Sequence, residues 1–169
     1  ALGEKTIPVL HGMVRLPEGK MSSRSGNVIT VTWLFDEAKL RVMQLVSDEV
    51  QDKDAVAEMI GVAAVKYAFL RSSVGRDITF DIGESVSFEG NSGPYLQYVY
   101  ARTQSVLRKA KTNSFDFTDT IVASNDEERE LMRLLARFDE VIYEAALKRA
   151  PSTICTYLFD LAQAYNLFY

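Results

Sequence analysis

A short polar stretch between Gly19 and Gly26 holds the residues best suited to chemistry. Two cationic donors, Lys20 and Arg24, stand four positions apart in it. Hydroxyl groups accompany them at Ser22, Ser23 and Ser25. Charged donors bind phosphate oxygens, and glycines let the backbone approach a ligand closely. In phosphoryl or nucleotidyl transfer a protein acts mostly by positioning groups and by stabilising charge on the transferring phosphate. The stretch therefore predicts a phosphate-binding loop, with an ordinary polar surface loop as the alternative.

A second stretch follows a glycine-rich turn at 88–94. From residue 95 to residue 111 there is no acidic side chain, although the whole chain carries a net charge of −4. The bases in this segment, which together give +4, are Arg102, Arg108, Lys109 and Lys111. Aromatic rings interleaved with bases suit RNA, because exposed bases stack on rings. The alternative is packing, since Tyr95, Val99 and Arg102 share one face of the expected helix.

The rarest residues exclude several other chemistries. The chain has one histidine, His11, and one cysteine, Cys155, so it has no internal disulfide. A structural zinc site needs about four ligands, and we predict no metal site in the chain. Cys155 lies in an apolar helical stretch and is expected to pack. His11 has no candidate partner nearby in sequence and is expected to be structural.

Composition places the chain among globular proteins. Its 169 residues suffice for one domain or two small pieces, and 47% are hydrophobic and 25% charged. No segment reaches the ~18 consecutive apolar residues of a membrane span. The N-terminus has no apolar region typical of a signal peptide. We therefore expect no membrane partner and a cytoplasmic location.

The elements that position these stretches can be read from glycine, proline and apolar spacing. Gly and Pro cluster in 1–26 and 75–94, which predicts loop, helices, loop, helices. Short apolar runs in 7–16 and β-branched residues at 28–32 indicate strand pieces. Helical spacing begins at Trp33 and extends to about Val50. A second helix, capped by Asp52 or Asp54, is apolar on nearly every side and should be buried.

The second half of the chain is also expected to be helical. Residues 77–88 alternate and indicate a strand or an extended connector. Pro94 is suited to the first position of a helix that reaches about Lys111. Further helices are expected from about Asn125 and from near Pro151. The chain ends in three large apolar residues at 167–169, which predicts further chain, a covering partner or self-association.

The sequence Lys-Met-Ser-Ser-Arg at 20–24 resembles the KMSKS signature of class I aminoacyl-tRNA synthetases. The longer string Gly-Lys-Met-Ser-Ser-Arg-Ser-Gly-Asn-Val at 19–28 is similar to the arginyl-tRNA synthetase version, with Ser23 and Arg24 departing from the common pattern. The resemblance implies catalytic roles in the full-length enzyme for Lys20, Ser22, Ser23 and Arg24. It implies that the ATP loop is formed by Lys20, Met21, Ser22, Ser23, Arg24 and Gly26.

The string Glu-Gly-Asn-Ser-Gly-Pro-Tyr-Leu-Gln-Tyr at 89–98 resembles the start of the anticodon-binding domain of that family. The segment 157–169 is also similar to this helical bundle. The resemblance implies that RNA lies near Gly90, Asn91, Ser92, Gly93, Tyr95, Gln97, Tyr98 and Arg102. The basic helix adds Arg108 and Lys111 to the predicted RNA contacts.

The resemblance implies a mainly α fold in which connecting helices and an anticodon-binding bundle follow a short α/β remnant of the catalytic Rossmann-type domain. We expect the catalytic remnant at 1–30, the connecting helices at 31–87 and the bundle at 88–169. The implied activity is arginine–tRNA ligation, with ATP and Mg²⁺ as cofactors and arginine and tRNA as partners of the full-length enzyme. Its HIGH motif contains two histidines, so this chain is expected to be a fragment, cut at both ends, that is inactive alone and holds no cofactor.

Two alternatives remain at this point. A non-catalytic helical RNA-binding module explains the helices but not residues 19–28. Another class I synthetase, such as the cysteinyl enzyme, shares the loop and a related bundle. That enzyme is expected to have a strict Lys-Met-Ser-Lys-Ser motif and a zinc site, and neither is present in this sequence.

Overall fold

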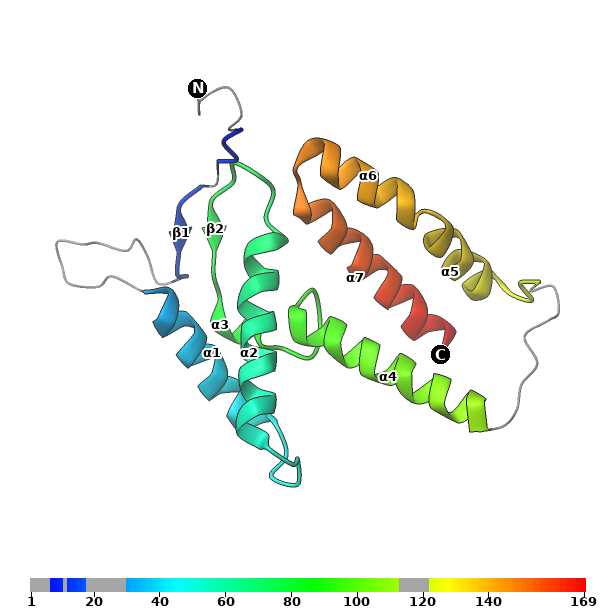
Figure 1. The fold of residues 1–169 in the computed structure, drawn as a ribbon, viewed down its shortest axis with the longest axis horizontal. Helices are drawn as coiled ribbons and strands as arrows, with labels where there is room; N and C mark the ends of the chain where they lie inside the picture. The colour runs from blue at the N-terminus through cyan, green and yellow to red at the C-terminus, as the bar shows by residue number, and fades with distance from the viewer. Residues whose placement is uncertain (1–6, 11, 18–29, 113–121) are drawn as a thin grey trace.

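The structure is a computed structural model that describes residues 7–10, 12–17, 30–112 and 122–169. Helices make up most of these residues, which confirms the predicted mainly α fold. Figure 1 shows two halves side by side. The first half holds two short strands and the first three helices, and the second holds four helices. The C-terminus lies in the second half, between α4 and α5 in this view.

The first half is built on two helices that pack against each other. Helix α1 spans Val31–Leu45, and the Thr30 side chain caps it by accepting a hydrogen bond from the Trp33 amide at 3.1 Å. Helix α2 spans Lys53–Leu70, and Asp52 caps it through the Ala55 amide, as one of the two predicted caps. Thr30 is extended as the cap of α1, and the predicted strand character at 28–32 is wrong for Val31 and Thr32, which open the helix. There the cap and the packing of α1 on α2 override the β preference of branched side chains.

Small residues let α1 and α2 approach closely. Ala38, Ala57 and Ala64 are fully buried between them or against neighbouring elements. A Cβ atom on Gly61 would lie only 3.0 Å from the backbone nitrogen of Lys39. Helix α2 is buried along much of its length, as its apolar sequence predicts.

Two short strands and one short helix complete the first half. Strand β1 (Val14–Arg15) pairs in parallel with β2 (Ile78–Thr79), and Val14 is opposite Ile78. The predicted alternation after residue 77 gives only this short strand. The reason is that Asp81 then caps helix α3 (Ile82–Ser85) by accepting from the Glu84 amide at 2.9 Å.

The second half is a helical bundle. It consists of α4 (Gly93–Thr112), α5 (Asp126–Ala136), α6 (Phe138–Lys148) and α7 (Pro151–Phe168). Helix α7 lies between α4 on one side and α5 with α6 on the other (Figure 1). The predicted starts at Asn125 and Pro151 are confirmed, because Asn125 caps α5 and Pro151 opens α7.

Helix α2 joins the two halves, since it contacts α1 on one side and both α4 and α7 on the other. The chain crosses between the halves at 86–92, directly before α4. Among the helices that the structure describes, none is long and apolar enough to cross a membrane.

Candidate nucleic-acid interface

The predicted phosphate loop lies outside the described residues. This applies to Lys20, Met21, Ser22, Ser23, Arg24 and Gly26, and also to His11. The described residues nearest to the stretch are Pro17, which follows β1, and Thr30, which caps α1. Beside them a cavity of about 400 Å³ is lined by Trp33, Asp81 and other side chains. The roles given to the loop residues therefore stay predictions.

The glycine-rich turn before α4 holds its shape through its own polar groups. Gly90 has φ +75°, a left-handed conformation that favours glycine. Ser92 is buried, and its hydroxyl donates to the Ser87 carbonyl while accepting from the Tyr95 amide at 3.1 Å. Ser92 therefore caps α4, so the helix begins at Gly93, one residue before Pro94.

The start of α4 lies directly against α2. A Cβ atom on Gly93 would be 2.5 Å from the carbonyl oxygen of Ala63, so no larger residue fits without movement. Pro94 is among the largest fully buried side chains of the described residues. The Asn91 side-chain oxygen lies 2.6 Å from the Tyr67 hydroxyl, and the Asn91 carbonyl accepts from Arg71 at 2.6 Å. The predicted RNA contacts of Gly90, Asn91, Ser92 and Gly93 stay predictions, and the structure gives these residues contacts within the chain.

Farther along α4, aromatic and basic side chains meet the end of α7. The Asn166 side chain donates to the Tyr95 hydroxyl at 2.8 Å and accepts from Arg102 at 3.2 Å. The Arg102 guanidinium lies 3.8 Å from the ring centroid of Tyr169 and 6.0 Å from that of Tyr98. Stacking on two rings fixes a guanidinium with part of its surface free for a phosphate or a base.

The rest of the predicted RNA face varies in exposure. Tyr98 is 47% exposed, and Arg108 is also exposed. Gln97 is half-buried, and its side-chain oxygen is buried without a hydrogen-bond partner among the described residues. Lys111 lies in the last turn of α4. Tyr98 and Arg108 can therefore be reached from solvent, whereas Tyr95, Gln97 and Arg102 are partly covered.

The RNA contacts predicted from the sequence omit three residues that belong to this region. Lys109 is exposed and follows Tyr98 by eleven positions and Arg102 by seven, spacings that place all three on one face of α4. Helical periodicity alone could have identified it. Asn166 and Tyr169 lie more than 60 positions from their partners on α4. Their contacts depend on how α7 packs, and no local pattern indicates them.

Cys155 and the acidic side chains that the structure describes form no second site. Burial raises the pKa of the Cys155 thiol, and a thiol that stays protonated is a weak nucleophile and a poor metal ligand. Within the described residues no three acidic, histidine or cysteine side chains are grouped to hold a metal ion.

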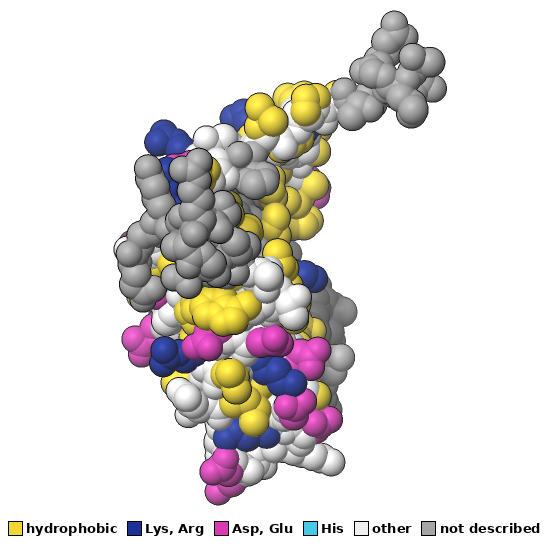
Figure 2. Space-filling view, turned by 90° about the vertical axis from the view of Figure 1, so that its left-hand side faces the viewer, with side chains coloured by type: hydrophobic (Ala, Val, Ile, Leu, Met, Phe, Trp, Pro, Cys, Tyr) yellow, Lys and Arg dark blue, Asp and Glu magenta, His cyan; other side chains and the backbone are white. Residues whose placement is uncertain are grey.

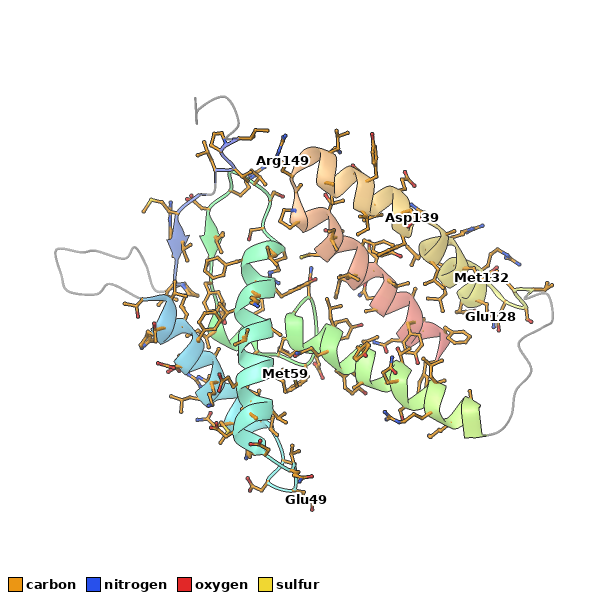
Figure 3. The ribbon with its side chains drawn as sticks, in the orientation of Figure 1. Glu49, Met59, Glu128, Met132, Asp139 and Arg149 are labelled. Carbon is orange, nitrogen blue, oxygen red and sulfur yellow. The ribbon has the colours of Figure 1, made fainter. Side chains whose placement is uncertain are left out.

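A groove separates α4 from α5. An almost wholly apolar cavity of about 460 Å³ lies here, bordered by Leu96, Leu131 and Tyr165 among others. A neighbouring cavity reaches Glu128 and Met132 of α5, both labelled in Figure 3, and Phe168 near the C-terminus. The groove does not offer the charge that a phosphate backbone requires, whereas α4 carries four bases and no acids.

Comparisons with known proteins match both halves. Residues 6–82 match the family model of the class I (R) tRNA synthetase catalytic domain, and residues 96–169 match that of the DALR anticodon binding domain. An arginine–tRNA ligase from Ignicoccus hospitalis is 40% identical, over 98% of this chain and 27% of the relative. One from Flavobacterium psychrophilum is 39% identical, over 94% of this chain and 27% of the relative.

The fold has a counterpart among solved structures. Thermus thermophilus arginyl-tRNA synthetase matches with a TM-score of 0.79 and 31% identity, over 94% of this chain and 26% of that one. The chain thus spans about a quarter to a third of the length of the relatives it matches. The predicted boundaries at residues 30 and 87 stay predictions.

Proposed function

Because this chain belongs to the arginyl-tRNA synthetase family, we propose that it serves the ATP-dependent attachment of arginine to its tRNA. In that reaction arginine and ATP give arginyl adenylate and pyrophosphate. The arginyl group then passes to the terminal adenosine of the tRNA. The chain contributes two parts, the phosphate loop and the RNA-binding bundle, and it acts in the cytoplasm, where these substrates meet.

In the first part, Lys20 and Arg24 stabilise charge on the triphosphate, and Ser22 and Ser23 position it. Cationic and hydroxyl donors fit ATP phosphates, whereas Mg²⁺ prefers carboxylate, carbonyl and water oxygens. The residues of this loop would therefore hold the nucleotide, and Mg²⁺ bound to its phosphates would add to the charge stabilisation.

In the second part, the bases of α4 contact tRNA. Tyr98 and Arg102 supply a stacking surface, and Arg108 and Lys111 contact phosphates farther along the helix. The prediction that RNA also lies near Gly90, Asn91 and Gly93 is kept in this proposal.

The exposed residues Leu167 and Tyr169 support the further proposal that the isolated chain self-associates, which sedimentation at increasing concentration measures.

One observation carries the proposal. The half that matches the catalytic-domain model and the half that matches the anticodon-binding model, which contains the acid-free helix, are packed together through α2. A non-catalytic RNA-binding module accounts for α4–α7 but not for the match of residues 6–82 to a catalytic domain. The match to the arginine-specific family model favours arginine over the cysteinyl alternative.

A chimera tests the proposal. Residues 1–169 replace the matching segment of the Thermus thermophilus enzyme, and arginylation of tRNA is measured. We expect the chimera to form arginyl-tRNA, whereas the 169-residue chain alone shows no pyrophosphate exchange with ATP, arginine and tRNA. A folded chimera without arginylation, or exchange by the chain alone above background, would contradict the proposal.

A further inference from the structure

We propose that Tyr67, Arg71 and Asn91 form a joint that fixes the direction of α4 and α7 relative to the half that carries the predicted phosphate loop. The importance of this direction rests on the proposed function, because one tRNA must then contact both halves together. The three residues are positioning residues. They act by orienting the RNA-facing helix, and they do not touch ATP or arginine.

The need for a joint follows from the topology. The described chain passes from the first half to the second once, at 86–92 (Figure 1). A single covalent connection leaves two packed bodies free to rotate unless other contacts hold them. Helix α2 supplies those contacts, since it packs against both α4 and α7.

Tyr67 is the centre of the joint. It lies on α2, is 8% exposed, and its hydroxyl is 2.6 Å from the Asn91 side-chain oxygen and 3.0 Å from the Cys155 carbonyl oxygen. A phenol has one proton to donate, so both acceptors are fully satisfied only if the Asn91 amide is turned to donate its N–H to the phenol. The phenol then donates to Cys155. In either orientation of the amide, one hydroxyl connects α2, the turn before α4, and α7.

Arg71 holds the same turn from the other side. It follows the last residue of α2 and donates to the Asn91 carbonyl at 2.6 Å and to the Glu84 carboxylate of α3 at 2.7 Å. Asn91 is therefore bound through both its side chain and its backbone. Charge-assisted bonds of this kind are stronger than bonds between neutral groups.

Close packing leaves the joint little freedom. Gly93 follows Asn91 by two positions, and its Cα lies so near the Ala63 carbonyl that a Cβ atom would be only 2.5 Å away. This backbone contact fixes the position of the start of α4, and the neighbouring hydrogen bonds then fix its direction. The loss of one bond therefore tilts α4 and α7 about this point, because the core on either side stays packed.

The only cysteine of the chain reports on the joint. Cys155 is 6% exposed, and its own carbonyl is the acceptor from Tyr67. Separation of α7 from α2 therefore exposes its thiol to a reagent such as dithiobisnitrobenzoate, and the rate of labelling measures how often the joint opens. The experiment uses the full 169-residue chain and needs no tRNA.

Two tyrosines give a matched pair of variants. Tyr67→Phe removes the bond between the halves, and Tyr157→Phe removes a buried 2.9 Å bond to the Leu134 carbonyl within the second half. We expect Tyr67→Phe to speed labelling about fivefold, the population change expected for one lost hydrogen bond. Tyr157→Phe should leave the rate within about twofold of the parent. Asn91→Ala, at an exposed position, removes one partner of the Tyr67 hydroxyl but leaves its bond to Cys155, so it should speed labelling less than Tyr67→Phe does; it also guards against a variant that fails to fold.

The dependence on urea separates opening of the joint from unfolding. Opening exposes little surface, so labelling of Tyr67→Phe should depend weakly on urea, unlike global unfolding. In the chimera, Tyr67→Phe should lower kcat/KM for tRNA arginylation several-fold and leave the KM for ATP unchanged.

The inference is overturned if Tyr67→Phe and Asn91→Ala label no faster than Tyr157→Phe, or if their labelling has the urea dependence of global unfolding. Failure of the proposed function gives a different result. In that case the thiol responds as expected, but neither the chain nor the chimera acts on tRNA.

Discussion

Two buried phenols hold distant parts of this chain together, and their ionisation sets a limit on its stability. Burial raises the pKa of Tyr67 from its ordinary value of 10.0 to about 12, and burial also raises the pKa of Tyr157. Both hydroxyls therefore stay protonated, and able to donate, well above neutral pH. An anion at either position would lose its hydrogen bond to a carbonyl and lie unsolvated.

The stability of the chain should consequently fall at high pH. Because the pKa of Tyr67 is higher in the folded state, its contribution is complete below pH 10 and is lost as the pH rises from 10 to 12. Over that range one such group lowers the free energy of unfolding by about 1.4 kcal/mol per pH unit. Urea unfolding at several pH values measures the slope. Tyr67→Phe should show a shallower slope, and an equal slope in both proteins would contradict this account.

Lys20 allows a test at the level of catalysis. In the chimera described above, Lys20→Ala removes one charged donor to the transferring phosphate. The loss of such a donor typically costs ~2.7–4 kcal/mol of transition-state stabilisation, or about 10²–10³ in kcat. Steady-state arginylation gives the number, and Lys148→Ala on exposed α6 is the matched control. An unchanged kcat for Lys20→Ala would mean that the loop does not stabilise the transition state.

Residue types alone indicate part of the candidate site. The acid-free run after Tyr95 predicts the basic helix, and Tyr98 and Arg102 lie near each other on it. The partners of Arg102 cannot be found in this way. Asn166 and Tyr169 reach it only because α7 packs along α4, and Gly93 matters because of a carbonyl 30 positions earlier in the chain.

Among the elements, α4 depends most on its first residue. Gly93→Ala places a Cβ atom 2.5 Å from the Ala63 carbonyl, so α4 has to move away from α2. Overpacking of this kind typically costs ~1–3 kcal/mol. Gly83→Ala is the control, because its Cβ would meet only the Asp81 side chain at 3.3 Å. Urea unfolding should show a loss for Gly93→Ala and little change for Gly83→Ala, and similar values for the two would contradict the close approach of α4 to α2.

The starts of α2, α5 and α7 can be predicted because neighbouring residues mark them. Asp52 and Asn125 cap their helices through amides three positions ahead, and Pro151 opens α7. The strand predicted at 28–32 is wrong for Val31 and Thr32, whose β-branched side chains favour strands, because the Thr30 cap and the burial of Leu34 favour a helix. The break between α5 and α6 lies at Arg137, and it could not be predicted because the sequence has no glycine or proline there.

The net charge of the whole molecule is small, but its charged side chains are distributed unevenly. Figure 2 faces the α1 side and shows acidic and basic side chains interspersed on the first half. By contrast, α4 carries bases and no acids in its sequence. The net charge of −4 therefore conceals one element that attracts a polyanion. The arrangement of the halves, which brings this element next to α2, depends on contacts such as the one from Tyr67 to Cys155, 88 positions away, and no local pattern predicts it.

Binding of arginine-accepting tRNA to the 169-residue chain, measured from low to moderate salt, shows whether α4 is the RNA-facing helix. About three or four phosphate contacts along α4 predict a slope of roughly −2 to −4 for log affinity against log salt. Arg108→Glu should weaken binding and flatten the slope, whereas Lys148→Glu, an equal change of charge on α6, should leave both unchanged. Affinity that does not depend on salt, or equal losses in the two variants, would contradict the assignment of α4 as the RNA-facing helix.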